Sequence, residues 1–110
     1  MILTSHSTYS AAEDFIIPFD FSNRALLVGE TTAGSTGNPR RVPLPGGGNF
    51  RVVTLRTLYP DGTDWVGTGV KPDVEVHLSQ QDIYEGKTPI LTKGIEVINN
   101  WDVFSKTLGE

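Results

Sequence analysis

Residues 1–29 read MILTSHSTYSAAEDFIIPFDFSNRALLVG, and this stretch decides the fold class. The apolar run at 1–4 leads into small polar residues, which predicts the end of a buried strand. A second apolar run at 25–28, closed by Gly29, predicts another buried strand. Between them, apolar residues recur at the spacing of one helix face: Ala12, Phe15, Ile16 and Phe19. Strand, helix and strand in so short a span predict a βαβ unit with parallel strands.

The remaining sequence predicts loops, short strands and a terminal helix. Pro18 has no amide hydrogen, so the first helix is expected to kink or end near Ile17. Residues 30–48 are rich in Gly and Pro, which predicts a long loop. The elements expected after Gly29 are an extended piece at 40–44, a strand at 50–58, a short hairpin partner at 65–69, an edge strand at 74–78 and a helix at 89–106, with a second short turn at 101–104.

The composition limits which classes of protein this chain can belong to. The 110 residues are 37% hydrophobic and 20% charged, which is typical of one small globular domain. The net charge of −4, with Arg40 and Arg41 as the only adjacent basic pair, argues against a nucleic-acid partner. No apolar run reaches the roughly 20 residues of a membrane span. The chain has no cysteine and no signal peptide, and its abrupt start suggests a piece of a longer chain.

Ser10 has two readings. With Glu13 three residues later, it matches a capping box, in which the serine hydroxyl and the glutamate carboxylate each accept from the other residue's amide. A serine between a strand and a helix also lies at the positive end of the helix dipole. There the N–H of Ala11 could stabilise an oxyanion, so that Ser10 would be a nucleophile. Spacing alone favours the cap, because caps are far commoner and the local sequence offers no clear base.

Other candidate sites are weaker. The stretch from Gly29 to Thr36 has the glycine spacing of a phosphate loop but lacks its lysine, so it predicts an ordinary loop. Asp61, Asp64 and Asp73 lie among turn residues without the spacing of a Ca²⁺ loop, which favours solvated carboxylates over a metal site. The two tryptophans, Trp65 and Trp101, are expected to be core or interface anchors.

Four motifs in order resemble one enzyme family. They are ILTSHSTYSAAEDF at 2–15, NRALLVGETTAGSTGNP at 23–39, LPGGGNFRV at 44–52 and GTGVKPDVEV at 67–76. Together these motifs resemble the carboxyl-terminal half of the catalytic domain of C-terminal processing serine peptidases, including the tricorn-like and retinoid-binding-protein-like branches. The resemblance covers residues 2–78, and the order and spacing of the motifs are more specific than any one of them.

The resemblance implies a role for Ser10 and leaves its base open. It implies that Ser10 is the nucleophile and Ala11 an oxyanion donor, with Gly34 and Ser35 at the pocket rim. The processing-peptidase branch has its lysine base at the position of Ser35, and a hydroxyl cannot replace an amine there. The tricorn-like branch takes a histidine from upstream. This sequence offers His6 as a weak candidate base and His77 as a weaker one.

The resemblance also implies an α/β, ClpP/crotonase-like core fragment: a βαβ unit, additional strands and a C-terminal helix. Residues 1–110 would form a single partial domain, without the upstream half, a further oxyanion glycine or the usual PDZ module. The expected function is peptide-bond hydrolysis without metal or cofactor, on a peptide or protein substrate. The isolated chain is expected to be inactive and to self-associate or pair with the upstream region. The parent protein would be periplasmic, in the cell envelope or secreted. The alternative is a non-catalytic member that binds peptides or apolar ligands, with Ser10 only a cap.

Overall fold

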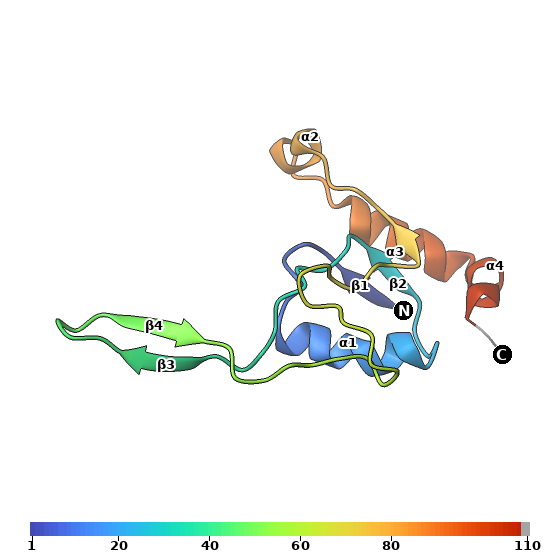
Figure 1. Cartoon of the computed structure of the whole chain (residues 1–110). Coiled ribbons are helices and arrows are strands. Elements are labelled where there is room, and N and C mark those ends of the chain that lie inside the picture. Colours follow the sequence, from blue (N-terminus) through green and yellow to red (C-terminus); the bar gives the residue numbers. More distant parts are fainter. Residues whose placement is uncertain (109–110) are drawn as a thin grey trace.

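The structure, a computed structural model, describes residues 1–108, without the side chain of Thr107 (Figure 1). Its elements are β1 (Ile2–Thr4), α1 (Ala11–Phe21), β2 (Leu27–Gly29), β3 (Arg40–Pro43), β4 (Asn49–Val52), β5 (Val74–Glu75), α2 (Gln80–Tyr84), α3 (Pro89–Asn99), α4 (Trp101–Phe104) and a 3₁₀ turn, η1 (Ser105–Thr107). None of the helices within residues 1–108 is long and apolar enough to cross a membrane.

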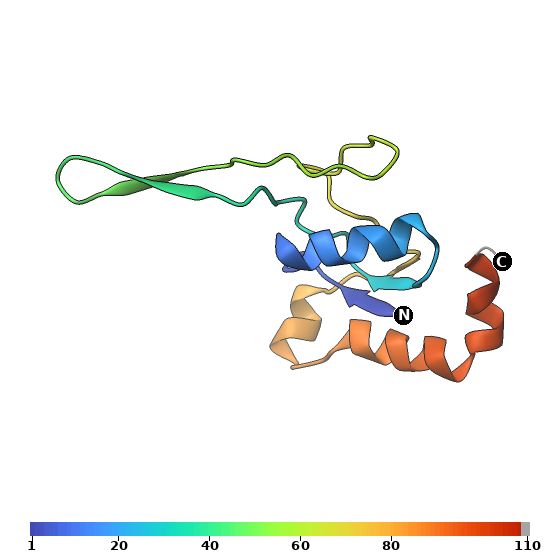
Figure 2. The same cartoon turned by 90° about the horizontal axis from the view of Figure 1, so that it is seen from below.

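A parallel three-stranded sheet lies at the centre of the molecule. The strand order is β1-β2-β5, and Ile2 pairs with Leu27 while Val28 pairs with Val74. Figure 2 shows α1 on one face of this sheet and α3 on the other. The predicted parallel βαβ unit is therefore confirmed. The strand β5 lies at the edge of the sheet as expected, but it ends at Glu75 and not at residue 78.

Alternating side chains of β2 supply both layers of the core. Leu27 faces α1 and packs with Ile16 and Ile17 of that helix. Trp65 and Val70, from the segment between β4 and β5, complete the cluster. Leu26 and Val28 face the other way and pack with Val97 of α3. A strand covered on both faces has a continuous apolar sequence, and this explains the uninterrupted run before Gly29.

Helix α1 differs from the prediction in its length and in its buried face. It continues past Pro18 to Phe21, so of the two predicted alternatives, a kink or an end near Ile17, the end is wrong. A proline removes one hydrogen bond from the helix, and the burial of Ile16 and Ile17 on the sheet offsets that loss. Phe15 is 59% exposed, because the buried face carries Glu13 with Ile16 and Ile17 instead of the predicted aromatic residues.

A long hairpin, here called the arm, extends from the body and consists of β3, β4 and the connection between them (Figure 1). The two strands pair antiparallel, with Arg41 opposite Arg51. The predicted strand at 50–58 is only partly correct, because β4 ends at Val52. The partner is β3 rather than 65–69, where residues 66–68 form a turn. All residues of both arm strands are exposed.

The carboxyl-terminal region is helical as predicted, in separate pieces. The expected helix forms α3, and the second short turn forms α4. Gly94 is buried within α3, where an added Cβ would lie 2.9 Å from a methyl group of Leu3. This glycine therefore lets α3 approach β1 closely. The short helix α2 was not predicted. Ser79 caps it by accepting from the Asp82 amide at 3.1 Å.

Two glycines in one loop differ in the space that their surroundings leave for a side chain. Gly67 and Gly69 both have positive φ, at 88° and 80°, but only at Gly69 would a Cβ collide, 2.2 Å from the Thr32 carbonyl oxygen. We expect Gly69→Ala to lower the free energy of unfolding by about 3 kcal/mol and Gly67→Ala by about 1 kcal/mol. Urea unfolding followed by the fluorescence of buried Trp65 measures both, and equal losses would contradict the collision.

Candidate active site

The loops that leave β1 and β2 meet at one edge of the sheet. Parallel strands have their carboxyl ends on the same edge, so residues 5–10 and 30–36 are brought together. Their backbones are joined by hydrogen bonds from Ala33 N–H to the Thr8 carbonyl at 2.9 Å and from Ser10 N–H to the Ser35 carbonyl at 2.7 Å. Ser10 is thus placed between the end of β1 and the start of α1, against the second loop.

Ser10 has a strained backbone. Its φ of 58° and ψ of −125° form a combination that glycine adopts readily and residues with a Cβ rarely do. The other positive-φ residues besides glycine within 1–108 are two asparagines, a type that tolerates positive φ better. Strain of this kind persists only where the surroundings impose it, and it is concentrated at functional sites. A strained strand-to-helix turn is also how hydrolases with an α/β sheet expose a nucleophilic serine.

The Ser10 side chain borders an open hollow. This hollow has a volume of about 270 Å³, and its lining comes from the Ser10 turn, the second loop and the arm: Tyr9, Ser10, Ser35, Thr36, Pro39, Arg51 and Val53. Ser10 itself is half-buried. A hydroxyl at this position is accessible to a ligand and is also close to the start of a helix.

Glu13 holds the Ser10 turn and the second loop together. Its side chain is fully buried, and one carboxylate oxygen accepts from the Thr32 hydroxyl at 2.5 Å and from Gly34 N–H at 2.6 Å. The other oxygen accepts from Ser10 N–H and from Ser35 N–H, both at 3.0 Å. Four donors and the positive end of α1 compensate this carboxylate without a basic side chain.

The predicted capping box is confirmed. The Glu13 carboxylate accepts from Ser10 N–H at 3.0 Å, and the Ser10 side chain faces the Glu13 amide as the box requires. That amide donates mainly to the Ser10 carbonyl oxygen, at 2.8 Å. The carboxylate side of the box therefore fixes the turn more firmly than the hydroxyl side.

Ala11 is the first residue of α1, and its amide is free to donate. Nothing within residues 1–108 accepts a hydrogen bond from the Ala11 N–H. The first amides of a helix have no intrahelical acceptor and carry its positive end. An anionic oxygen bound beside Ser10 would find this donor.

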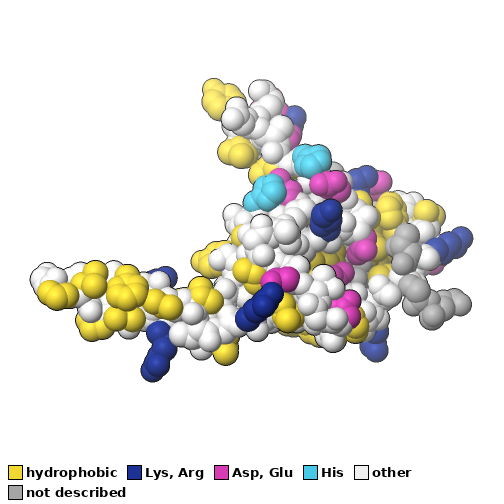
Figure 3. All heavy atoms as spheres, in the orientation of Figure 1, with side chains coloured by type: hydrophobic (Ala, Val, Ile, Leu, Met, Phe, Trp, Pro, Cys, Tyr) yellow, Lys and Arg dark blue, Asp and Glu magenta, His cyan; other side chains and the backbone are white. Residues whose placement is uncertain are grey.

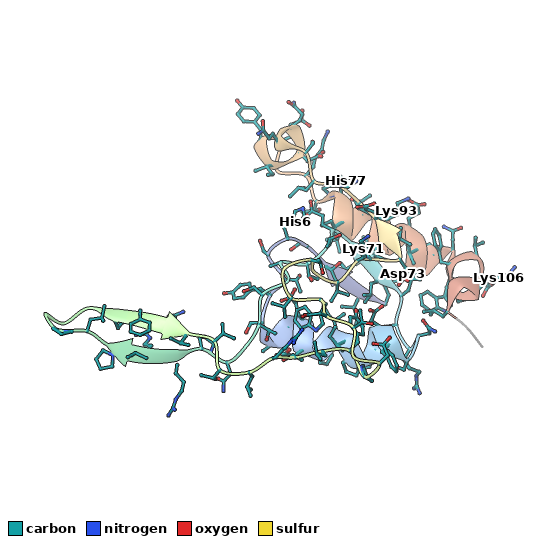
Figure 4. All side chains as sticks on the ribbon, in the orientation of Figure 1. His6, Lys71, Asp73, His77, Lys93 and Lys106 are labelled. Atoms are coloured by element: carbon teal, nitrogen blue, oxygen red, sulfur yellow. The ribbon has the colours of Figure 1, made fainter. Side chains whose placement is uncertain are left out.

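The two histidines lie away from the hollow. His6 donates its backbone N–H to the buried Glu30 carboxylate at 3.3 Å, and its ring lies 3.9 Å from the other Glu30 oxygen. His77 lies 3.7 Å from Glu75. Figure 4 shows both rings on the side of the molecule away from α1. Neither ring lines the hollow.

The pocket-rim residues have separate roles. Ser35, at the position where the resemblance implies a lysine, lines the hollow and binds Glu13 through its amide. Gly34 is buried and also binds Glu13, with a φ of 67°. A Cβ on Gly34 would lie 2.6 Å from the Gly69 nitrogen, so only glycine fits between the two loops.

The aspartates considered for a metal site have structural partners. Hydrogen bonds from Thr63 lower the pKa of Asp61, and the hydrogen bond from Arg56 lowers the pKa of Asp64. Asp73 accepts from Leu27 N–H at 2.7 Å and so joins the loop before β5 to β2. In the part of the chain that the structure describes, no group of three or more His, Cys, Asp or Glu side chains could hold a metal ion.

The tryptophans differ in burial. Trp65 is 1% exposed and lies in the core beneath α1, whereas Trp101 is 37% exposed. Trp65 is therefore a core anchor, as predicted.

Two features of the site were not predicted. Glu13 was interpreted only as a cap, although it lies three and four residues before the buried Ile16 and Ile17, a spacing that places it on the core face. Arg51 was not identified, because it lies far from Ser10 in the sequence and reaches the hollow only through the fold of the arm.

Comparison with known proteins agrees with this geometry. Residues 1–76 match the sequence profile of peptidase family S41. A peptidase described as putative, from Parabacteroides merdae, aligns with 86% of this chain at 27% identity and a TM-score of 0.68. The photosystem II D1 C-terminal processing protease aligns with 67% at 34% identity and a TM-score of 0.56. The tricorn protease aligns with 98% at 23% identity and a TM-score of 0.72, which shows a shared fold.

These similarities confirm the α/β, ClpP/crotonase-like fold class. The chain spans 30% of the length of the Parabacteroides merdae protein, 19% of the D1 processing protease and 10% of the tricorn protease. The activities of those longer proteins are therefore carried over to this chain only as proposals.

Proposed function

Because this chain belongs to peptidase family S41, we propose that it carries the nucleophile of a serine peptidase that hydrolyses peptide bonds through an acyl-enzyme on Ser10. The Ser10 oxygen attacks the substrate carbonyl, and its proton passes to a base. The Ala11 N–H stabilises the resulting oxyanion. The C–N bond then breaks, the protonated amine leaves, and water hydrolyses the Ser10 ester to release the acid.

The conformation of Ser10 is the observation that carries this proposal. A residue that served only as a cap would have no need of a strained φ of 58° and ψ of −125°, because helix caps ordinarily have an extended backbone. Ser10 also lines a hollow, beside the Ala11 amide that has no acceptor within residues 1–108. Both features favour attack on a bound carbonyl over capping.

The base is proposed to come from outside these residues. No histidine, lysine or carboxylate lines the hollow among residues 1–108, and Ser35 cannot accept a proton at neutral pH as an amine can. His6 remains a candidate only if the 5–10 loop rearranges, since its ring lies beside Glu30. A basic side chain from another part of the protein, or from a second copy, would complete the site.

Reaction with a fluorophosphonate tests the proposal. The probe phosphonylates an activated serine oxygen with loss of fluoride, and peptide mapping by mass spectrometry identifies the modified residue. We expect modification at Ser10 in the longest form of the protein that contains this chain. Ser10→Ala is the matched control and should remain unmodified. Labelling that survives in Ser10→Ala, or that maps to another serine, would refute the assignment.

A second candidate function is peptide binding without cleavage. The same absence of a base from the described lining of the hollow favours it. In that case the hollow would hold a peptide, and Ser10 would remain unmodified by the probe while peptide still bound. The labelling experiment therefore separates the two candidates.

A further inference from the structure

The arm carries an uncompensated pair of arginines next to the Ser10 hollow. Residues 31–60 contain four arginines and no Asp or Glu, although the whole chain has a net charge of −4. Figure 3 shows basic and hydrophobic side chains along the arm, while the acidic side chains gather on the body. Arg56 pairs with Asp64 at 2.7 Å. Arg41 and Arg51 form no ion pair within residues 1–108.

The register of the arm places these two cations side by side. Arg41 pairs directly with Arg51 across the strands, so their side chains stand on the same face. Like charges directly opposite one another destabilise a hairpin. An anion bound between the two guanidinium groups would remove this repulsion, and guanidinium groups bind carboxylates with paired hydrogen bonds.

The same face of the arm leads into the hollow. Pro39 and Val53 stand just outside the two strands, next to the pair of Arg40 and Val52. Pro39, Arg51 and Val53 line the hollow with Ser10, and Arg41 lies next to Arg51 outside that lining. Arg40 pairs with Val52 on the opposite face of the strands from Arg41 and Arg51. A polypeptide that enters the hollow along the arm would meet Arg51, with Arg41 beside it.

We propose that Arg41 and Arg51 form a carboxylate-binding subsite that selects peptides with a negative charge a few residues from the bond held at Ser10. The inference rests on the proposed function in taking the ligand to be a peptide. The carboxylate is either an acidic side chain or the free C-terminus of the peptide, and both present the same chemistry to the arginines. Arg51 is the one charged residue in the described lining of the hollow, and Arg41 is its cross-strand neighbour on the arm.

Peptide capture by the Ser10→Ala chain tests the subsite without turnover. The immobilised 110-residue chain is incubated at 0.15 M salt with random octapeptides that carry one fixed Glu or, in a second pool, Gln at the same position. Each pool is made with a free and with an amidated C-terminus, and the captured peptides are counted by mass spectrometry. We expect about tenfold enrichment of the carboxylate form, the effect of one charge-assisted hydrogen bond. Enrichment of Glu in the amidated pools identifies a side chain, and enrichment of free over amidated termini identifies the C-terminus.

Arg40→Gln is the matched control. Arg41→Gln and Arg51→Gln should each abolish the enrichment, whereas Arg40→Gln makes the same change of net charge on the other face and should preserve it. Circular dichroism confirms that the variants fold. Equal losses in all three variants would show unspecific attraction and overturn the proposal, as would the absence of enrichment in both comparisons. The result does not depend on labelling of Ser10, so failure of the subsite and failure of the peptidase assignment are distinguishable.

Discussion

Replacing Ser10 with glycine should stabilise the chain while it abolishes reaction with a fluorophosphonate. Glycine adopts the φ of 58° and ψ of −125° without the steric cost that a Cβ imposes. After the greater entropy of glycine in the unfolded chain is subtracted, we expect a gain of about 1 kcal/mol in the free energy of unfolding. The loss of labelling should be complete, because the variant has no oxygen to phosphonylate.

Ser10→Ala separates the strain from the chemistry. Alanine also lacks the hydroxyl, so its labelling should be lost equally, but it keeps the Cβ and should gain no stability. Urea unfolding of the three proteins, followed by circular dichroism and Trp65 fluorescence, measures the difference. A stability of Ser10→Gly at or below that of Ser10→Ala would mean that the turn is not strained. The inference that the chain loses stability because it holds Ser10 in a reactive conformation would then be wrong.

The βαβ unit could be predicted from sequence because its signals are local. The apolar runs of β1 and β2 are bounded by turn residues, and the parallel pairing follows from the helix between them. The predicted end of α1 at Ile17 failed because tertiary burial of Ile16 and Ile17 outweighs the hydrogen bond that Pro18 lacks. Long-range packing of this kind has no signature within one helix.

The arm shows what local sequence signals cannot predict. Its strands satisfy the local preference for extended structure, so residues 40–44 were predicted well. Which segment pairs with them depends on the turn at 44–48, where Leu44 N–H donates to the Gly48 carbonyl at 2.8 Å. Loop composition predicted a long loop over residues 30–48, but neither the hairpin turn within it nor the register of the two strands. The position of Arg51 at the Ser10 hollow depends on that register and could not be predicted without it.

The turn that carries Ser10 was found through its motif, but the contacts that support this turn were not predicted. Ser10 and Ala11 lie where the family resemblance expects them, at the start of a helix. The carboxylate of Glu13 makes long-range contacts with Thr32, Gly34 and Ser35 that capping geometry does not predict. A glutamate on the buried face of a helix needs partners, and this need was the available signal for its role.

Glu13→Ala is expected to be the most destabilising substitution in the site. It leaves the Gly34 and Ser35 amides and the Thr32 hydroxyl without their acceptor, whereas Ser10 N–H keeps its bond to the Ser35 carbonyl. Each unsatisfied buried donor costs about 1 to 3 kcal/mol, so we expect a loss of about 4 kcal/mol in the free energy of unfolding. Urea unfolding measures the loss. Glu13→Gln keeps the size and one acceptor oxygen, and about half that loss is expected.

Asp14→Ala is the control for the loss of a carboxylate from the same helical turn. Asp14 accepts only from the exposed Thr36 hydroxyl at 3.0 Å, and its removal should cost less than about 1 kcal/mol. The folded fraction of the Glu13→Gln protein should also react with the fluorophosphonate at Ser10 on the order of 10²-fold more slowly. A small displacement of a reacting group is enough for a change of this size in rate. If Glu13→Gln reacted at the normal rate despite its lower stability, Glu13 would support the fold without positioning Ser10. Slower labelling in Glu13→Gln, together with a normal rate in Asp14→Ala, would instead mean that the buried carboxylate holds the reactive serine in place.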